Sequence, residues 1–195
     1  MRKINFKILI PAVFILLGCF SCQTALKLFL RIKEPKQFVG NEEREEYYEP
    51  FMEKTPKYYS SLKIYTISDT TALMAFMRKH TSYPMVIIQN TETDSIYKLG
   101  CFEDMKWDVE NINKEELDYL IPGKQNQYND IRELLKNHAI IWHESYDSTV
   151  THTNKWDVYM VSATFFGKKL RRMSLPVTEI KNIDNFNIID LSVNE

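Results

Sequence analysis

Apolar positions between residues 62 and 193 change repeatedly between the spacing of a strand and the spacing of a helix. Runs rich in β-branched and aromatic residues predict strands over 62–67, 85–89, 95–99, 139–142, 158–165 and 186–193. Apolar residues three and four positions apart predict helices over 69–80, 102–112, 131–138 and 168–181. This alternation indicates an α/β domain, a central sheet flanked by helices.

Local signals mark where some of these elements begin and end. Ser68 or Asp69 is placed to cap the helix that follows, and Pro176 is expected to kink or break the last helix. The polar residues 90–94 lie between two expected strands and predict a hairpin.

A further helix is expected in the middle of the chain. Asn113, followed three residues later by Glu116, resembles a capping box. This spacing predicts a helix that starts at Asn113 and ends before Pro122.

The N-terminus has the pattern of an export signal. Three cations precede an apolar run over 8–17, which is too short to span about 30 Å of hydrocarbon. The stretch 16–19 (Leu-Leu-Gly-Cys) resembles a bacterial lipobox, which implies that residues 1–18 are a lipoprotein signal peptide and that Cys19 carries the lipid. The alternative is an uncleaved membrane anchor over 8–26.

Residues 19–60 are interpreted as a tether and connector, and residues 61–195 as a single folded domain. Within the connector, the acidic run over 41–49 predicts a solvated face. Calcium binding is disfavoured there because the run lacks the acidic spacing of a calcium loop.

Composition narrows the classes of function. The 25 basic and 26 acidic residues nearly cancel, which argues against a nucleic-acid partner, and 5 glycines make a phosphate-binding loop improbable. Cys22 and Cys101 remain if Cys19 is lipidated. A disulfide between them stays open, as does a free, buried Cys101.

Two segments resemble the halves of a thioredoxin-type fold. Residues 62–100 are similar to its second half: a strand, a helix, an X-Pro step and a hairpin. Residues 156–193 are similar to its first half: a strand, an aromatic-rich turn, a helix and a strand. The halves stand in reversed order, as in a circular permutation. Pro84 falls at the family's cis-proline, although the simpler explanation is that it ends the preceding helix.

The reactive positions of that family are changed in this chain. Phe166 and Lys169 stand where the resemblance would place the two redox cysteines. Exchange of a disulfide needs a reactive thiolate and a second, resolving thiol, which these side chains do not provide. The resemblance therefore implies a redox-inactive domain with no catalytic residue, in which Pro84 shapes a groove for an extended peptide.

We therefore expect a lipoprotein of the cell envelope, held at the outer membrane or the periplasmic face, similar to small bacterial envelope lipoproteins. Its expected role is non-catalytic binding or scaffolding of a protein or peptide, without a cofactor. A thiol oxidoreductase or peroxidase relative that uses Cys101 is the alternative, and an immunity-like or inhibitor protein is a third possibility.

Other polar groups have simpler interpretations. His143, Glu144, Asp147 and His152 lack the spacing of a metal site and predict a polar loop. His80 and His138 stand near helix ends, where a cation suits the helix dipole. A cluster of basic residues predicts a solvated helix face, with anionic lipid headgroups or an acidic partner as the alternative: Lys168, Lys169, Arg171 and Arg172.

Overall fold

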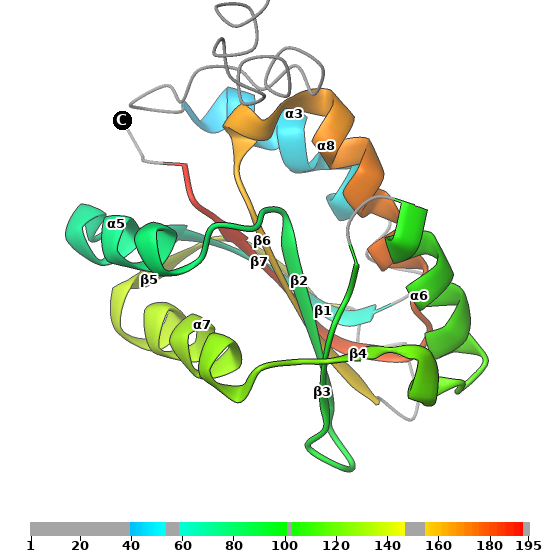
Figure 1. Ribbon diagram of the computed structural model, residues 1–195. Helices are drawn as coiled ribbons and strands as arrows, with labels where there is room; N and C mark the ends of the chain where they lie inside the picture. Colours follow the sequence, from blue (N-terminus) through cyan, green and yellow to red (C-terminus); the bar gives the residue numbers. More distant parts are fainter. Residues whose placement is uncertain (1–39, 54–58, 101–102, 147–154, 193–195) are drawn as a thin grey trace, which may run out of the picture.

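The computed structural model describes residues 40–53, 59–100, 103–146 and 155–192 (Figure 1). Their strands are β1 (Tyr59–Ile67), β2 (Met85–Asn90), β3 (Ile96–Lys98), β4 (Ile121–Pro122), β5 (Ala139–Tyr146), β6 (Trp156–Ser162) and β7 (Ile183–Asp190). Their helices are α3 (Asn41–Met52), α5 (Thr70–Lys79), α6 (Glu103–Asn113), α7 (Gln125–His138) and α8 (Gly167–Ser174), with the 3-10 turns η1 (Leu117–Tyr119), η2 (Thr164–Phe166) and η3 (Leu175–Glu179).

The strands form one mixed sheet in the order β4-β3-β2-β6-β7-β1-β5. β6, β7 and β1 are parallel neighbours at its centre. β2 runs antiparallel to β6, and β5 runs antiparallel to β1. The expected α/β class, with a sheet flanked by helices, is confirmed.

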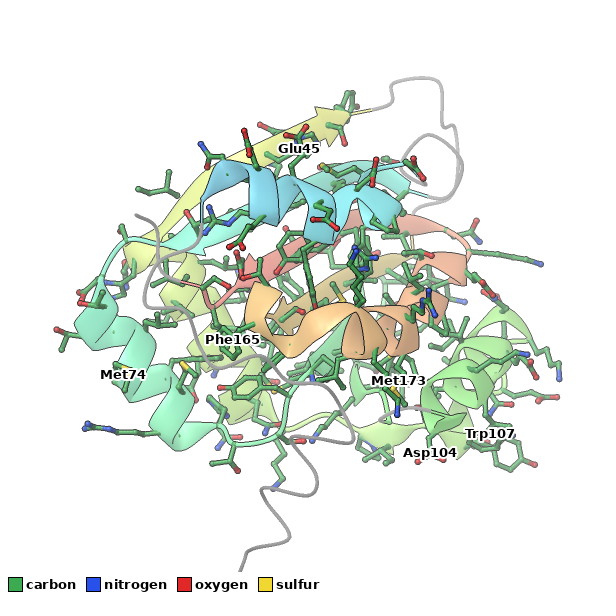
Figure 2. All side chains as sticks on the ribbon, turned by 90° about the horizontal axis from the view of Figure 1, so that it is seen from above. Glu45, Met74, Asp104, Trp107, Phe165 and Met173 are labelled. Carbon is green, nitrogen blue, oxygen red and sulfur yellow. The ribbon has the colours of Figure 1, made fainter. Side chains whose placement is uncertain are left out.

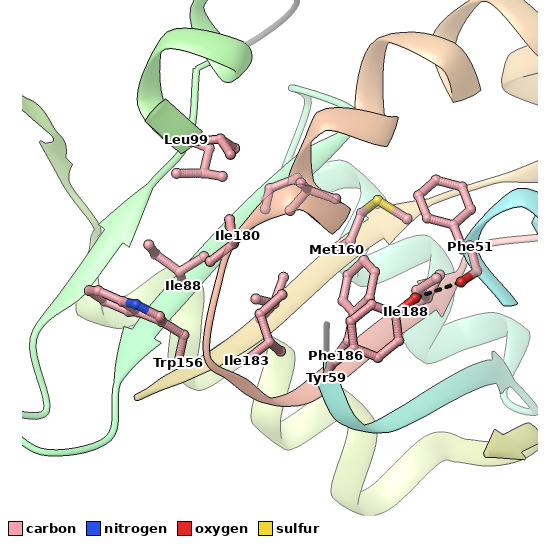
Figure 3. Close-up of a cluster of buried hydrophobic side chains, with 14 of the residues drawn as sticks. Phe51, Tyr59, Ile88, Leu99, Trp156, Met160, Ile180, Ile183, Phe186 and Ile188 are labelled. Carbon is pink, nitrogen blue, oxygen red and sulfur yellow. Dashed lines mark hydrogen bonds between the residues drawn. The ribbon is translucent and has the colours of Figure 1, made fainter. Parts of the chain in front are cut away.

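One face of the sheet is covered by α3, α6 and η3. Ile88, Met160 and Ile188 project from three strands into a cluster that these helices close (Figure 3). At one end of the cluster, Phe186 meets the rings of Tyr59 and Phe51, with centroids 5.2 and 6.3 Å away. The Tyr59 hydroxyl donates a hydrogen bond to the carbonyl oxygen of Phe51, which ties β1 to the end of α3.

The opposite face is covered by α5 and α7. Ile87, Val161 and Ile189 point to this side, against Phe76 of α5 and Ile131 of α7. Alternate residues of β2, β6 and β7 thus enter different clusters, which explains the continuous apolar runs Met85–Ile88 in β2 and Val158–Val161 in β6.

Several local signals act as expected. The Asp69 carboxylate accepts the backbone N–H groups of Thr71 and Ala72 at 2.8 and 3.1 Å and so caps α5. β2 and β3 form the expected hairpin. At Pro176 the last helix changes from α8 to the 3-10 turn η3, as expected for a proline that interrupts a helix.

The expected connector over 19–60 differs from the structure where it is described. Residues 41–52 form helix α3, whose Tyr48 and Phe51 are buried in the core. The glutamates expected on a solvated face do lie mainly outward, and Glu45 is exposed (Figure 2). The sequence did not predict this amphipathic helix. The buried side of α3 is made of tyrosines, a phenylalanine and one arginine, whereas aliphatic residues usually mark such a side.

The helix expected from Asn113 is wrong. Asn113 instead ends α6, and the chain continues as the short turn η1 and the two-residue strand β4. The Asn113 side chain donates to the carbonyl of Glu179 and accepts from the N–H of Lys181, so it joins α6 to the segment before β7. Glu115 adopts a positive φ of 63°, which a continuing helix excludes.

We expect Phe51→Ala to lower the free energy of unfolding by about 3–5 kcal/mol, because it opens a cavity in a cluster shared by α3 and the sheet. Urea unfolding of the full chain, followed by circular dichroism, measures this loss. Glu45→Ala on the exposed side of the same helix is the matched control, with a change within about 0.5 kcal/mol. Equal, small effects of both substitutions would mean that α3 is not part of the cooperative core.

Candidate functional site

The candidate site is the edge of the sheet at which β1, β6 and β7 end, here called the carboxyl edge. Ser162 and Asp190, the last residues of β6 and β7, lie side by side in the ladder. Met85, which follows Pro84, pairs with Val161, so β2 begins where β6 ends. Open α/β sheets bind their ligands outside this edge of the strands, so the carboxyl edge is the expected position of a ligand site.

Helix α3 closes the carboxyl edge with a buried ion pair. Arg44 Nε donates to Asp190 Oδ2 at 2.7 Å, and the two side chains are only 1% and 0% exposed. The other carboxylate oxygen of Asp190 accepts the backbone N–H of Ser192 at 3.0 Å. Burial raises the pKa of Asp190, and the Arg44 guanidinium opposes that rise. The pair fixes the first described helix to the end of the last strand.

Two tyrosines of α3 complete this buried cluster. Tyr47 and Tyr48 stack edge to face with ring centroids 4.9 Å apart. Burial raises the pKa of Tyr47 to about 12 and holds that of Tyr48 well above its ordinary value. Both phenols are therefore neutral at physiological pH.

The turn after β6 is packed against the segment that precedes β2. Thr164 bonds twice to the Ser192 hydroxyl: its N–H donates at 3.0 Å, and the two hydroxyl oxygens are 2.6 Å apart. The buried ring of Phe166 lies 6.0 Å from the ring of Tyr83. The peptide bond between Tyr83 and Pro84 is cis. The structure thus brings Pro84 and Phe166, 82 positions apart in the sequence, to the same edge.

The basic cluster on α8 is largely engaged with α3. The two helices lie side by side along the carboxyl edge (Figure 2). Lys168 Nζ pairs with a Glu46 carboxylate oxygen at 2.7 Å. Arg171 donates to the backbone carbonyls of Glu46 and Tyr47 at 2.7 and 3.2 Å, and its guanidinium lies 5.7 Å from the Tyr47 ring centroid. The expected solvated face is therefore wrong for Arg171, which binds backbone carbonyls in the middle of the neighbouring helix α3.

The possible metal ligands do not come together. His143 and Glu144 lie on strand β5 rather than in the expected polar loop, and Glu144 pairs with Lys63 of β1 at 3.0 Å. Asp147 and His152 lie outside the described residues. Within the described ranges, no three histidine, cysteine, aspartate or glutamate side chains are placed to hold a metal ion.

His80 and His138 do stand at helix ends, at the C-cap of α5 and the last position of α7. Each also faces a carboxylate of the other helix, which their sequence positions do not reveal. His80 Nε2 lies 2.9 Å from Asp130 Oδ2, and His138 Nδ1 lies 3.2 Å from Asp69 Oδ2.

The cysteines and the proposed signal lie outside the described residues, including Cys19, Cys22 and Cys101. None of the helices in the described ranges combines the length and apolarity needed to cross a bilayer. Comparison with models of protein families, with curated proteins and with solved structures found no match to this chain.

The pairing of Arg44 with Asp190 was not predicted from the sequence. One signal was available, since an aspartate that ends an apolar strand must find a partner if it is buried. The sequence does not identify that partner, because Arg44 and Asp190 are 146 positions apart.

We expect Arg44→Met and Asp190→Asn each to lower the free energy of unfolding by about 3–5 kcal/mol, because each leaves a buried charge without its partner. The double variant Arg44→Met/Asp190→Leu removes both charges and should be more stable than either single variant. Urea unfolding of the full chain at pH 7 measures all three.

The pH dependence separates the two single variants. Without Arg44, only the hydrogen bonds from Ser192 oppose the effect of burial, so the pKa of Asp190 rises further and the folded state takes up a proton more readily than the unfolded state. Lowering the pH from 7 to 5 should therefore reduce the deficit of Arg44→Met relative to wild type. Asp190→Asn lacks the carboxyl group and should show no such recovery. Identical pH profiles for both variants would contradict a buried, paired Asp190.

Proposed function

We propose that this chain is a lipid-anchored binding or scaffolding domain of the cell envelope, thioredoxin-like in arrangement and without enzymatic activity. The observation that carries the proposal is the closed carboxyl edge. The place where an open α/β sheet binds its ligand is filled by the buried Arg44–Asp190 pair and by the aromatic side chains around it.

The strand order supports a thioredoxin-like arrangement in permuted order. The two segments that resemble the halves of that fold share one sheet, in which β6 and β7 lie between β2 and β1. β6, α8 and β7 form a parallel strand–helix–strand unit, and β2 and β3 add an antiparallel hairpin beside β6.

The surroundings of Phe166 support the absence of thiol chemistry. Phe166 is buried against Tyr83 and lies in the turn that the Thr164–Ser192 contacts hold. A nucleophilic thiolate needs access to its substrate and a group that stabilises its charge. A buried phenyl ring meets neither requirement, so the turn after β6 is a structural element.

The envelope location rests on the sequence of the first 19 residues. An apolar run behind three cations, followed by Leu-Leu-Gly-Cys, matches the lipoprotein signal described above. A tethered domain without an open active site is suited to holding a protein or peptide partner at the membrane surface.

An insulin-reduction assay tests the part of the proposal that excludes thiol oxidoreductase activity. The full chain, reduced beforehand, should not accelerate the precipitation of insulin by dithiothreitol beyond the rate with dithiothreitol alone, because the turn after β6 holds no thiol. A dithiol oxidoreductase serves as the positive control. If the chain does accelerate insulin precipitation and Cys101→Ala abolishes this effect, the oxidoreductase alternative is correct and the non-catalytic binding role is wrong.

The anchor is tested by metabolic labelling with a radioactive fatty acid in a bacterial host. Wild type and Cys22→Ala should incorporate the label and move to the detergent phase on phase separation. Cys19→Ala should do neither, because the thiol that accepts the lipid is missing. Labelling that persists in Cys19→Ala but is lost in Cys22→Ala would move the lipid to Cys22, and loss in neither would overturn the anchor.

A further inference from the structure

A groove runs between α5 and α7, on the face of the sheet opposite to α6. Its α5 wall contains Ala72, Ala75, Phe76 and Lys79, which recur at the spacing of one helix face. Its α7 wall is built in the same way, from four residues: Asp130, Glu133, Leu134 and His138. The two helices lie side by side in Figure 1, and their ends are joined by ionic contacts.

The groove is hollow because α5 presents two alanines where larger side chains would meet α7. Its volume is about 240 Å³, and Phe76 and Leu134 form an apolar floor. Sites for whole small-molecule ligands usually enclose about 300–1,000 Å³. The size of the α5–α7 groove therefore suits a single long side chain rather than a complete ligand.

Polar contacts between α5 or its N-cap and α7 close the groove at both ends. Lys79 Nζ lies 2.7 Å from Asp130 Oδ1, so its positive charge is compensated. At the other end, His138 faces Asp69. These contacts hold the two walls of the groove together. The charge in the middle of the groove is then determined by a residue that neither contact includes.

That residue is Glu133. It lies on the exposed rim of the groove, and its carboxylate makes no ion pair or hydrogen bond with any described residue. With Asp130 neutralised by Lys79, Glu133 gives the middle of the groove a negative charge above an apolar floor. A complementary group has an apolar stem and a positively charged end.

We propose that the α5–α7 groove is a binding site for an arginine side chain of a partner polypeptide. The methylene stem of arginine packs on Ala72, Ala75 and Leu134, and its guanidinium pairs with the Glu133 carboxylate. Arginine combines these two properties, and its planar head binds a carboxylate with two parallel hydrogen bonds. The site is separate from the carboxyl edge, so it depends neither on the anchor nor on the absence of thiol chemistry.

Nuclear magnetic resonance of the isotope-labelled full chain in detergent tests the site, with N-acetyl-arginine methylamide as the probe. The probe should shift the methyl signals of Ala75 and Leu134 and saturate at millimolar concentration. The citrulline analogue has nearly the same shape without the charge and should bind about tenfold more weakly, because a hydrogen bond between charged groups is lost.

Three variants decide the outcome. Glu133→Gln should weaken binding about tenfold, and Ala75→Leu, which fills the groove from an exposed position, should abolish it. Glu110→Gln on the exposed side of α6 is the control and should bind as wild type does. Equal binding of citrulline and arginine, unchanged binding by Glu133→Gln, or shifts confined to other surfaces would each overturn the proposal. Circular dichroism verifies that each variant is folded.

Discussion

The contact between Arg44 and Asp190 joins the first described helix to the last strand, and much of the architecture depends on it. Removing two charges from water is expensive unless each finds a partner in good geometry. The 2.7 Å contact meets that condition only if α3 lies across the ends of β6 and β7. Tyr47, Tyr48 and Phe51 then follow into the core, and Arg171 of α8 binds the carbonyls of α3. The ion pair therefore fixes the orientation of α3, while apolar packing supplies most of the stability.

This arrangement gives the carboxyl edge and the α5–α7 groove different roles. The carboxyl edge, where many α/β sheets bind ligands, is closed by side chains of α3 and by the turn after β6. A groove lies instead between α5 and α7, where two alanines leave space and charged residues form the rim. A binding role without catalysis is consistent with this distribution, since such a surface needs shape and charge rather than a reactive group.

Elements with strong local signals could be predicted from the sequence. The Asp69 cap, the hairpin after β2 and the interruption at Pro176 depend on neighbouring residues. The expectations that failed depend on distant partners: Asn113 bonds across to Glu179 and Lys181 instead of starting a helix. His143 and Glu144 extend β5 because β1 offers an edge to pair with, although their own side chains are polar. The α5–α7 groove could not be predicted, because the spacing of each wall indicates only an ordinary amphipathic helix.

The position of β7 has a consequence for the timing of folding. The last of the described strands is a central one, and it carries Asp190, the partner of Arg44, which lies 146 positions earlier. At roughly 5–20 residues per second, a ribosome needs about 7–30 seconds to travel from one residue to the other. During that interval the nascent chain has neither a complete sheet nor a docking surface for the aromatic side of α3. The domain therefore closes only after β7 has emerged from the ribosome.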